Sequence, residues 1–313
     1  MYNPLISIII PTYNVEKYIA RALESCINQT FKDIEIIVVD DCGDDKSIEI
    51  TKEYALKDER IKIIHNKENL KLLRARYEGV KVAKAPYILF LDSDDYLELD
   101  ACEECVKILD ENTEMICFNA YIINNAKIPI ENYFTDTYSI EKFFPYLIKK
   151  DNFAWNAWGK LFKKDKLLKA FKELNLNNDK ITMAEDALIF SSYIKDIKNV
   201  KTFERYLYNY NCENVNSATS QKNINQIKNH IKDLEYCIQK ISTYSYDNAY
   251  CYLFCQYIIN CLQLHKYDLY YKNIAKNFIY KFILRIYRKK LKSKKNILIK
   301  KAKYILEGKQ CII

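Results

Sequence analysis

Glycine and proline are scarce in this sequence, with 4 and 5 among 313 residues. So few turn-forming residues exclude collagen-like, linker-rich and hairpin-rich all-β architectures. The sequence has no Walker A or GxGxxG motif, which argues against an ATPase or a dinucleotide-binding enzyme. It has no apolar stretch near the ~20 residues of a membrane-spanning helix, and its beginning lacks the charged and apolar regions of a signal peptide. We therefore expect a cytosolic location.

The eleven cysteines are odd in number and scattered without a repeated spacing. Cys102 and Cys105 form a lone CxxC with no second pair, and the residues around them follow a helical pattern. A zinc site would need further ligands at metal-binding spacing. We expect free, reduced thiols.

Positive charge is concentrated at the end of the chain. The whole sequence has 49 Lys and Arg against 41 Asp and Glu. From Lys266 onward there are 15 basic and two acidic residues, a net charge of +13, so the rest of the chain carries 34 basic and 39 acidic residues, or −5. An acidic body with a basic tail indicates a segment that docks on a surface, and not a nucleic-acid-binding domain.

The first hundred residues alternate between short apolar runs and segments of helical period. The runs predict strands at 5–10, 34–39, 61–65 and 87–91, and the segments between them predict helices at 15–28, 45–57 and 70–84. Near-continuous β-branched strands separated by helices are typical of a buried parallel sheet covered on both faces. Polar clusters follow the strands, where such sheets bind ligands. The edge formed by the strand carboxyl ends is therefore the candidate active site.

The rest of the chain is less regular. We expect a helix at 98–110, a strand at 115–118 and helical stretches over 160–196. From about 221 only helices are expected. The predicted domains are 1–215 and a helical region at 216–313.

Asp92-Ser93-Asp94 directly follows an apolar strand. A turn at this point can bring both carboxylates towards one ligand, and hard oxygen ligands suit Mg²⁺ or Mn²⁺ together with substrate phosphates. The alternative is a solvated turn in which Asp95 caps the next helix.

Four ordered motifs resemble the family 2 inverting glycosyltransferases of GT-A fold. They are Ile8-Ile9-Ile10-Pro11-Thr12-Tyr13-Asn14, Asn28-Gln29-Thr30-Phe31, Glu35-Ile36-Ile37-Val38-Val39-Asp40-Asp41 and Phe90-Leu91-Asp92-Ser93-Asp94-Asp95. The resemblance continues through Trp158-Gly159-Lys160-Leu161-Phe162, Ala184-Glu185-Asp186 and Tyr208-Asn209-Tyr210 to Asn216-Ser217.

Three sequence segments look most like lipooligosaccharide β-1,3-galactosyltransferases. They are Tyr18-Ile19-Ala20-Arg21, Leu73-Arg74-Ala75-Arg76-Tyr77-Glu78-Gly79 and Met183-Ala184-Glu185-Asp186. This resemblance implies transfer of galactose from UDP-galactose, in β-1,3 linkage, to a terminal sugar such as GalNAc. The alternatives are another UDP-hexose or UDP-N-acetylhexosamine transferase of capsule or O-antigen assembly, and a nucleotide-sugar-binding module without turnover.

The resemblance implies that the domain 1–215 has a nucleotide-binding half (1–96) and an acceptor half (97–215). It also assigns roles on the donor side. Pro11, Thr12 and Tyr13 would form the first loop, with Tyr13 stacking on uracil; the alternative is a plain turn. Asp41 would accept from uracil N3–H, and its alternative role is a helix cap. Arg76 would face the diphosphate, or form a surface ion pair instead.

The resemblance also implies a metal. Asp92 would contact the ribose or a metal-bound water, and Asp94 would ligate the Mn²⁺ or Mg²⁺ that bridges the two phosphates. Neutralising charge on the leaving diphosphate is the main electrostatic need of such a transfer.

On the acceptor side, Asp186 is the candidate catalytic base. One carboxylate suffices in an inverting transfer, because it only removes the proton of the attacking hydroxyl. Glu185 would hold the acceptor or serve as the base itself, although both acids also suit the first turn of a helix. Trp158, with Trp155 three residues before it, would form an acceptor platform or pack in the core.

Three positions depart from the family pattern. Cys42 stands where the family often has Gly in its Asp-Asp-Gly sequence, Lys71 replaces a frequent Gly in the third βα loop, and Tyr77 replaces a frequent Asn. These changes leave donor-sugar preference open.

The basic tail contains an amphipathic segment. Phe278, Ile279, Phe282, Ile283 and Ile286 share one helical face, and Lys281, Arg285, Arg288 and Lys289 share the other. This pattern fits docking on an anionic membrane, hence peripheral attachment to the inner face of the plasma membrane with a lipid-linked oligosaccharide as acceptor. It equally fits a core-facing helix with a solvated basic side.

Overall fold

The computed structural model describes residues 3–151, 155–176, 180–214, 223–275 and 277–309. The chain divides into two compact units. The first unit is Met1–Thr137, Asn156–Lys180 and Ile197–Val215, and the second is Tyr138–Trp155, Ile181–Asp196 and Asn216–Ile313. The second unit thus combines the helical end of the chain with two segments that precede residue 215.

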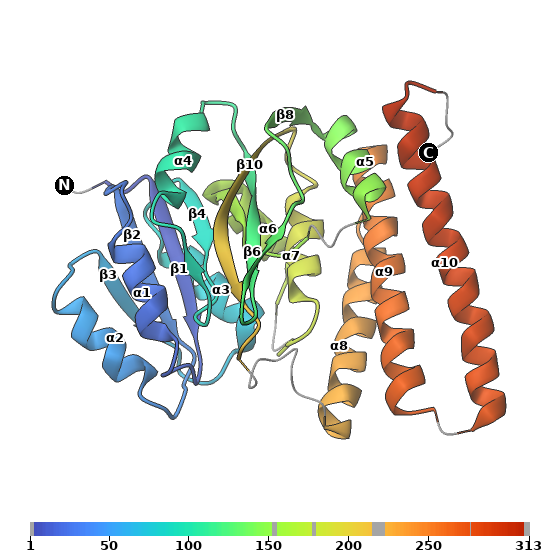
Figure 1. Cartoon of the computed structure of the whole chain (residues 1–313), viewed down its shortest axis with the longest axis horizontal. Coiled ribbons are helices and arrows are strands. Elements are labelled where there is room, and N and C mark those ends of the chain that lie inside the picture. The colour runs from blue at the N-terminus through green and yellow to red at the C-terminus, as the bar shows by residue number, and fades with distance from the viewer. Residues whose placement is uncertain (1–2, 152–154, 177–179, 215–222, 276, 310–313) are drawn as a thin grey trace. The chain divides into compact units, whose positions relative to one another are not determined.

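The first unit alternates strands and helices in its first half and is rich in strands in its second half (Figure 1). Its elements are β1 (Ile6–Thr12), α1 (Ile19–Ile27), β2 (Ile34–Asp40), α2 (Ser47–Ala55), β3 (Ile61–His65), α3 (Lys71–Val82), β4 (Tyr87–Phe90), β5 (Tyr96–Leu97), α4 (Ala101–Ile108), β6 (Met115–Ile123), β7 (Lys127–Ile130), β9 (Lys160–Lys163), α6 (Lys164–Leu174) and β10 (Asn199–Asn211). β8 (Asp136–Ser139) lies where the chain passes from the first unit to the second.

The sheet is built in the order β3-β2-β1-β4-β9-β6-β10-β5. β1 pairs in parallel with β2 and β4, and β2 pairs in parallel with β3, so the four predicted strands and the helices between them are confirmed. The second half is mixed, because β9 is antiparallel to both β4 and β6 while β10 is parallel to β6. The parallel half brings its strand carboxyl ends to one edge.

Helices cover both faces of the parallel half. Ile6, Ile8 and Ile10 of β1 share a core with residues of α1 and α4 on one face. On the other face α3 lies very close to the sheet at Gly79, where an added Cβ would come within 2.4 Å of Ile9 Cγ2. The close approach of α3 to β1 at this position therefore requires a residue without a side chain.

Five of the described strands, β5, β7, β8, β9 and β10, were not predicted from the sequence. The expectation of helix from residue 160 is wrong at its start, where β9 precedes α6. β10 spans Asn199–Asn211 and was not predicted, because it reads as neither a continuous apolar run nor a clean alternation. Its register against β6 shifts between Phe203 and Tyr208, so its side chains do not keep period two.

The second unit is helical, as the sequence predicts for its C-terminal part. It contains α5 (Ile140–Lys150), α7 (Glu185–Tyr193), α8 (Ile224–Ser242), α9 (Ala249–Asn273) and α10 (Phe278–Leu306). Asn223 and Gln226 form a capping box at the beginning of α8. The core of this unit stacks the ring of Phe254 against those of Phe144 and Tyr257. No described helix is long and apolar enough to span a bilayer.

The described cysteines are free thiols, most of them buried, while Cys42 and Cys212 are exposed. Cys102 and Cys105 lie on the buried side of α4, and burial raises the pKa of both thiols. No group of three or more His, Cys, Asp or Glu that could hold a metal ion occurs among the described residues. These thiols pack as small apolar side chains.

A buried carboxylate ties three strands to the end of α3. Glu35 of β2 accepts hydrogen bonds from Ser7 Oγ of β1 at 2.7 Å and from the backbone N–H of Lys84 at 2.5 Å, and it pairs with Lys62 of β3 at 2.6 Å. These donors hold the pKa of Glu35 below its usual value, against the opposing effect of burial. The ionised form is therefore part of the folded structure.

This network predicts an acid-dependent loss of stability. Because the pKa of Glu35 is lower when folded, its contribution is fully present above the unfolded value of about 4.5 and declines as the pH falls through the folded pKa. Glu35→Gln should lower the free energy of unfolding by about 1–3 kcal/mol at pH 7, and by less at pH 3.5. Urea unfolding at both pH values measures this, with exposed Glu53→Gln as the control. An equal loss at both pH values would contradict the role of the charge.

Candidate functional site

The candidate site lies at the carboxyl edge of the parallel strands. Thr12 ends β1, Asp40 ends β2, and the segment beginning at Asp92 follows β4. The backbone N–H of Asp41 donates to the carbonyl of Thr12 at 3.0 Å, which joins the first two of these strand ends. The sequence correctly predicted that these polar clusters share one edge, because parallel strands are in register.

Asp41 is buried and its carboxylate is largely occupied. It accepts from the Leu70 N–H at 2.7 Å, the Lys71 N–H at 2.9 Å and Asn66 Nδ2 at 2.8 Å. Leu70 is the N-cap of α3, so the helix that Asp41 caps is α3, and not the one that follows it in sequence. A carboxylate has about four acceptor positions. Three are used here, and the role towards uracil stays a prediction.

Arg76 forms a buried ion pair. Only 1% of its side chain is exposed, and its Nη2 donates to Asp92 Oδ1 at 2.8 Å. Its guanidinium carbon also lies 5.6 Å from the ring centre of Phe90. The alternative of a surface ion pair is therefore wrong. A guanidinium buried in this way holds its position before any substrate arrives, which suits a preorganised anion partner.

Asp95 fixes the conformation of the turn after β4. Its carboxylate is fully buried and accepts from the Tyr208 hydroxyl at 2.5 Å and from the Asn211 N–H at 2.7 Å. The Tyr208 oxygen in turn accepts from the Asp92 N–H at 3.2 Å. Burial, with the charges of Asp94 and Asp92 beside it, raises the pKa of Asp95 well above its usual value. Asp95 therefore positions the turn rather than capping the next helix.

Asp94 is the residue best placed to ligate a metal ion. Its carboxylate is partly exposed, with one oxygen 2.7 Å from Asn214 Nδ2, and its backbone carbonyl accepts from Arg21. Mg²⁺ is commonly held by one or two protein carboxylates together with waters and substrate phosphates. Asp94, with Asp92 two residues away, fits a site of that kind, which would be completed by a diphosphate.

The first loop presents Tyr13 to solvent. Pro11 and Thr12 are buried, whereas Tyr13 is 47% exposed, and Lys71 Nζ lies 5.6 Å from its ring centre. An exposed ring at this edge suits stacking on a planar base. The contact with uracil itself remains a prediction.

Two of the three positions that depart from the family pattern have a strained backbone conformation. Cys42 has φ 59° and Lys71 has φ 66°, in the left-handed region that favours glycine. The Lys71 amide nevertheless points at Asp41 and donates to it. Cys42 and Lys71 thus adopt a backbone conformation that favours glycine, and the strain is offset by the surrounding hydrogen bonds.

The two tryptophans lie in different units. Trp158 stacks on Tyr208 and Tyr210, with ring centres 5.0 Å and 5.5 Å apart. Trp155 is buried in the second unit against the edge of Tyr257. Trp155 therefore packs in a core. Trp158 is partly buried, and its role as an acceptor platform stays a prediction. Its ring contact with Tyr208 links it to Asp95.

Glu185 and Asp186 belong to the second unit and form the first turn of α7. Glu185 is buried, whereas Asp186 is partly exposed. Ala184, the N-cap residue, has φ 65°, and the helix dipole favours a charged carboxylate at this end. Exposure agrees with the choice of Asp186 over Glu185 as the candidate base. Asn216 and Ser217, the last residues of the resemblance, lie outside the described residues.

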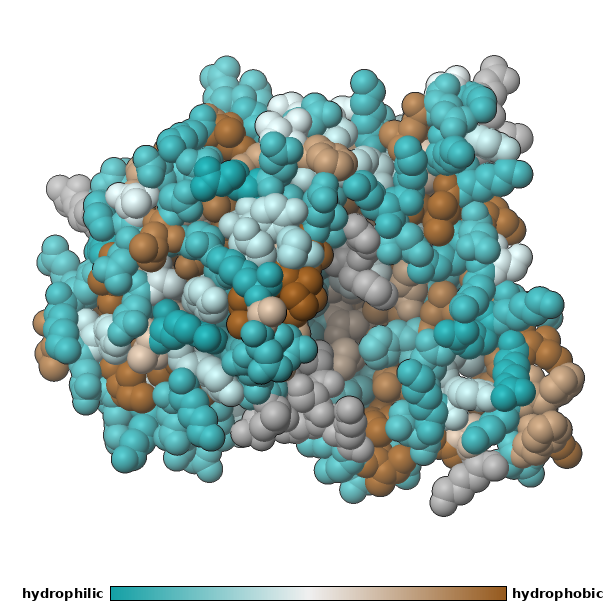
Figure 2. Space-filling view, in the orientation of Figure 1, coloured by the Kyte–Doolittle hydropathy of each residue, from teal (hydrophilic) through white to brown (hydrophobic). Residues whose placement is uncertain are grey.

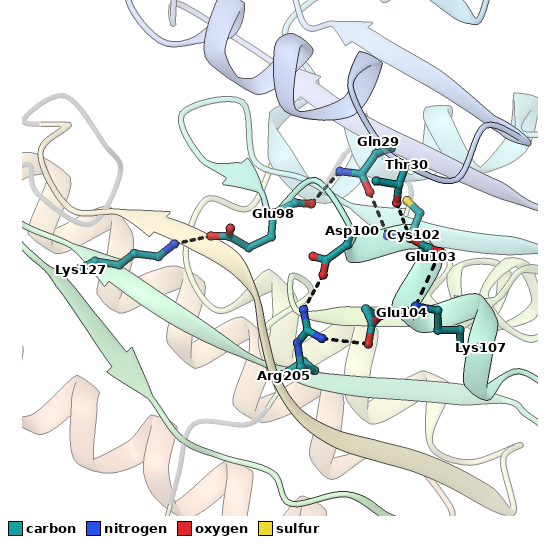
Figure 3. A network of polar contacts seen from close by, with 10 residues as sticks. All are labelled: Gln29, Thr30, Glu98, Asp100, Cys102, Glu103, Glu104, Lys107, Lys127 and Arg205. Atoms are coloured by element: carbon teal, nitrogen blue, oxygen red, sulfur yellow. Dashed lines mark hydrogen bonds and ion pairs between the residues drawn. The ribbon is translucent and has the colours of Figure 1, made fainter.

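The Asn28–Phe31 segment, one of the four motifs of the resemblance, has a structural role. Gln29 donates to the Glu98 carbonyl and accepts from the Cys102 N–H, and Thr30 Oγ1 donates to Glu103, so the segment anchors the beginning of α4 (Figure 3). Sequence reasoning counted this motif towards the family resemblance and assigned it no contact.

Beside this anchor lies a pocket that the sequence did not indicate. It measures about 290 Å³, and its lining residues are Glu98, Asp100, Tyr121, Lys127, Glu204, Arg205 and Tyr206. Lys127 pairs with Glu98 and Arg205 with Asp100, as Figure 3 shows. The residues that line the pocket come from β5, β6, β7 and β10 and from the segments beside these strands. No single segment of the sequence therefore predicts the pocket.

The Asp95–Tyr208 contact predicts a coupled loss of stability. Asp95→Ala and Tyr208→Phe should each lower the free energy of unfolding by about 1–3 kcal/mol, because each leaves a buried partner without its hydrogen bond. The double variant should lose less than the sum, with a coupling of about 1–2 kcal/mol. Urea unfolding of the four proteins measures this, with Tyr252→Phe on the exposed side of α9 as the control. Additive losses would contradict the contact.

A model of the family described as Glycosyl transferase family 2 matches residues 7–167, just over half of the chain. The putative glycosyltransferase EpsH of Bacillus subtilis is 41% identical over 119 residues, which are 38% of this chain and 34% of the relative. The uncharacterized glycosyltransferase EpsJ of the same organism is 32% identical over 225 residues, which are 69% of this chain and 63% of the relative. The chain thus spans about one third and just under two thirds of these relatives.

Solved structures share the architecture at low identity. Staphylococcus aureus TarS 1–349, in complex with UDP-GlcNAc, aligns with a TM-score of 0.69 at 17% identity, covering 98% of this chain and 93% of that chain. The mannosyltransferase PcManGT of Pyrobaculum calidifontis, in complex with GDP-Man and Mn²⁺, aligns with a TM-score of 0.56 at 13% identity, covering 98% and 86%. The expected GT-A fold, a sheet flanked by helices and followed by a helical region, is confirmed. The chain belongs to glycosyl transferase family 2.

Proposed function

We propose that this chain is a metal-dependent inverting glycosyltransferase that uses a UDP-sugar donor. The observation that carries the proposal is the turn after β4, where Asp92 is paired with buried Arg76 and Asp94 is left partly exposed above buried Asp95. Preorganised charge of both signs at one point suits a diphosphate leaving group with its cation. The structure of TarS with UDP-GlcNAc and that of PcManGT with Mn²⁺ support a donor and a metal of these kinds in this fold.

The donor half would bind the nucleotide through residues of three strand ends. Tyr13 would stack on uracil, while Pro11 and Thr12 shape its loop and Asp41 offers its remaining acceptor position to the base. Asp94, with Asp92, would hold a divalent ion, which supplies charge neutralisation at the leaving diphosphate. Arg76 would support the same charge from the buried side, because it fixes the position of Asp92.

The transfer would need one base. The acceptor hydroxyl oxygen attacks C1 of the donor sugar, the bond from C1 to the diphosphate oxygen breaks, and UDP leaves with the electron pair. Asp186 takes the hydroxyl proton, and configuration at C1 inverts. Glu185 and Trp158 would orient the acceptor sugar.

The sequence resemblance supports one specific form of this reaction. In that form galactose passes from UDP-galactose, in β-1,3 linkage, to a terminal sugar such as GalNAc on a lipid-carried oligosaccharide of lipooligosaccharide outer core. A transferase of another UDP-hexose or UDP-N-acetylhexosamine, of capsule or O-antigen assembly, is the alternative within the class. A nucleotide-sugar-binding module without turnover is the alternative outside it.

The donor is tested by UDP release. A panel of UDP-sugars, with a terminal β-GalNAc glycoside as acceptor, is assayed with Mn²⁺ and with EDTA. Turnover with UDP-galactose that EDTA abolishes is the expected result. Turnover with another sugar would contradict the galactosyl form, and turnover that is insensitive to EDTA would contradict the metal. UDP binding without turnover for any donor would favour the binding module.

The two carboxylates are tested by their amide variants. Asp186→Asn should lower kcat by about 10²–10⁴-fold while UDP binding is kept, because only proton transfer is lost. Asp94→Asn should lower kcat by a similar factor and weaken Mn²⁺-dependent UDP binding. Isothermal titration separates the two effects. Asp247→Asn, at an exposed position before α9, is the control and should match the wild type. Full activity of Asp186→Asn would reject it as the base.

A further inference from the structure

Helix α10 carries two separate apolar faces. Leu284, Leu291 and Leu298 recur every seven residues and are buried. Within the second unit this buried face is held by ion pairs, since Arg288 contacts Asp268 of α9 at 2.5 Å and Lys295 contacts Asp151 after α5 at 2.6 Å. The packing of α10 is thus accounted for by one face alone.

The second face is turned away from the core. Its residues are Phe278, Ile279, Phe282, Ile283 and Ile286, which we call the apolar stripe, and they are 78%, 68%, 56%, 54% and 46% exposed. Ile279, Phe282, Ile283 and Ile286 follow the spacing i, i+3, i+4, i+7 of one helical face. At 100° per residue this face lies opposite Leu284. Figure 2 shows hydrophobic atoms at the lower right, where α10 begins in Figure 1.

The exposure of the apolar stripe contradicts one of the two sequence interpretations. A core-facing amphipathic helix would bury this face, and that alternative is wrong for α10. Contiguous exposed apolar surface of this kind marks an interaction site. Scattered exposed apolar residues are ordinary, but five within about two and a half turns of one helix are not.

Basic side chains border the stripe. α10 has eleven Lys and Arg and no Asp or Glu. Arg285 and Lys289 lie on one side of the stripe by helical angle, and Lys290 and Lys294 on the other. Lys289, Lys290 and Lys294 are exposed and make no ion pair with any residue that the structure describes. Their charge is therefore available to an external partner.

We infer that α10 docks on an anionic phospholipid bilayer, with the apolar stripe at the boundary between headgroups and acyl chains. An apolar face bordered by lysines on both sides is the arrangement of helices that lie in a membrane interface. The charge argues against a second copy of the chain, because two such helices would repel each other. α10 would lie on the bilayer, since no described helix can span one. This surface is independent of the proposed reaction.

Vesicle co-sedimentation of the full chain tests this inference. Vesicles of phosphatidylcholine with about 30% phosphatidylglycerol should bind the protein, and vesicles of phosphatidylcholine alone should bind it much more weakly. The double variant Phe282→Ser, Ile286→Ser should lower the partition coefficient by at least about tenfold, because both side chains enter the bilayer. Lys289→Glu, Lys290→Glu should lower it similarly, and salt on the order of 0.5 M should weaken binding of the wild type.

The controls separate docking from misfolding and from self-association. Leu56→Ser removes an apolar side chain that is 89% exposed after α2, and it should bind vesicles like the wild type. Circular dichroism should show unchanged helix content in every variant. Absence of binding to the anionic vesicles would overturn the inference. A wild-type dimer in ultracentrifugation that Phe282→Ser, Ile286→Ser converts to monomer would also overturn it, in favour of a second copy as the occupant.

Discussion

The site depends on one buried contact, between the carboxylate of Asp95 and the hydroxyl of Tyr208. It joins the turn after β4 to β10, which are 113 residues apart in sequence. Removing a carboxylate from water is costly, as the raised pKa of Asp95 reflects. The cost is offset by donors from β10, and the result is a turn with a defined shape. Asp92 and Asp94 take their positions from this turn, and Trp158 rests on the other partner, Tyr208.

A second constraint is the absence of a glycine-rich phosphate loop. Asp41 occupies the N-terminal amides of α3, so that helix end is already satisfied by a carboxylate. The buried positive charge at this edge is that of Arg76, which is paired with Asp92. Cys42 and Lys71 keep the left-handed turns that glycine would make without strain. This edge of the sheet is thus built from side chains that hold one another in place, which is the arrangement that a preorganised electrostatic site requires.

The accuracy of sequence reasoning followed the regularity of the pattern. The strands β1 to β4 were predicted closely, because each is a continuous apolar run followed by a helix. β9 has four residues and is followed at once by α6, so its pattern was taken for helix. β10 is long but bulged. In the candidate site, Asp41, Arg76, Asp92 and Asp94 were proposed from their motifs. The contacts of Asp92 with Tyr208 and of Asp94 with Asn214 were not predicted. Contacts across more than a hundred residues leave no local signal.

The sequence by itself determined the family, the parallel half of the sheet and the edge at which the polar clusters meet, because strand direction and strand ends follow from local pattern. Only the tertiary structure decided what each carboxylate does: Asp41 caps α3, and Asp95 is buried beneath its neighbours. It also decided which face of α10 is covered. Both faces of that helix are apolar in sequence, and only the packing of α5 and α9 against Leu284, Leu291 and Leu298 leaves the other one exposed.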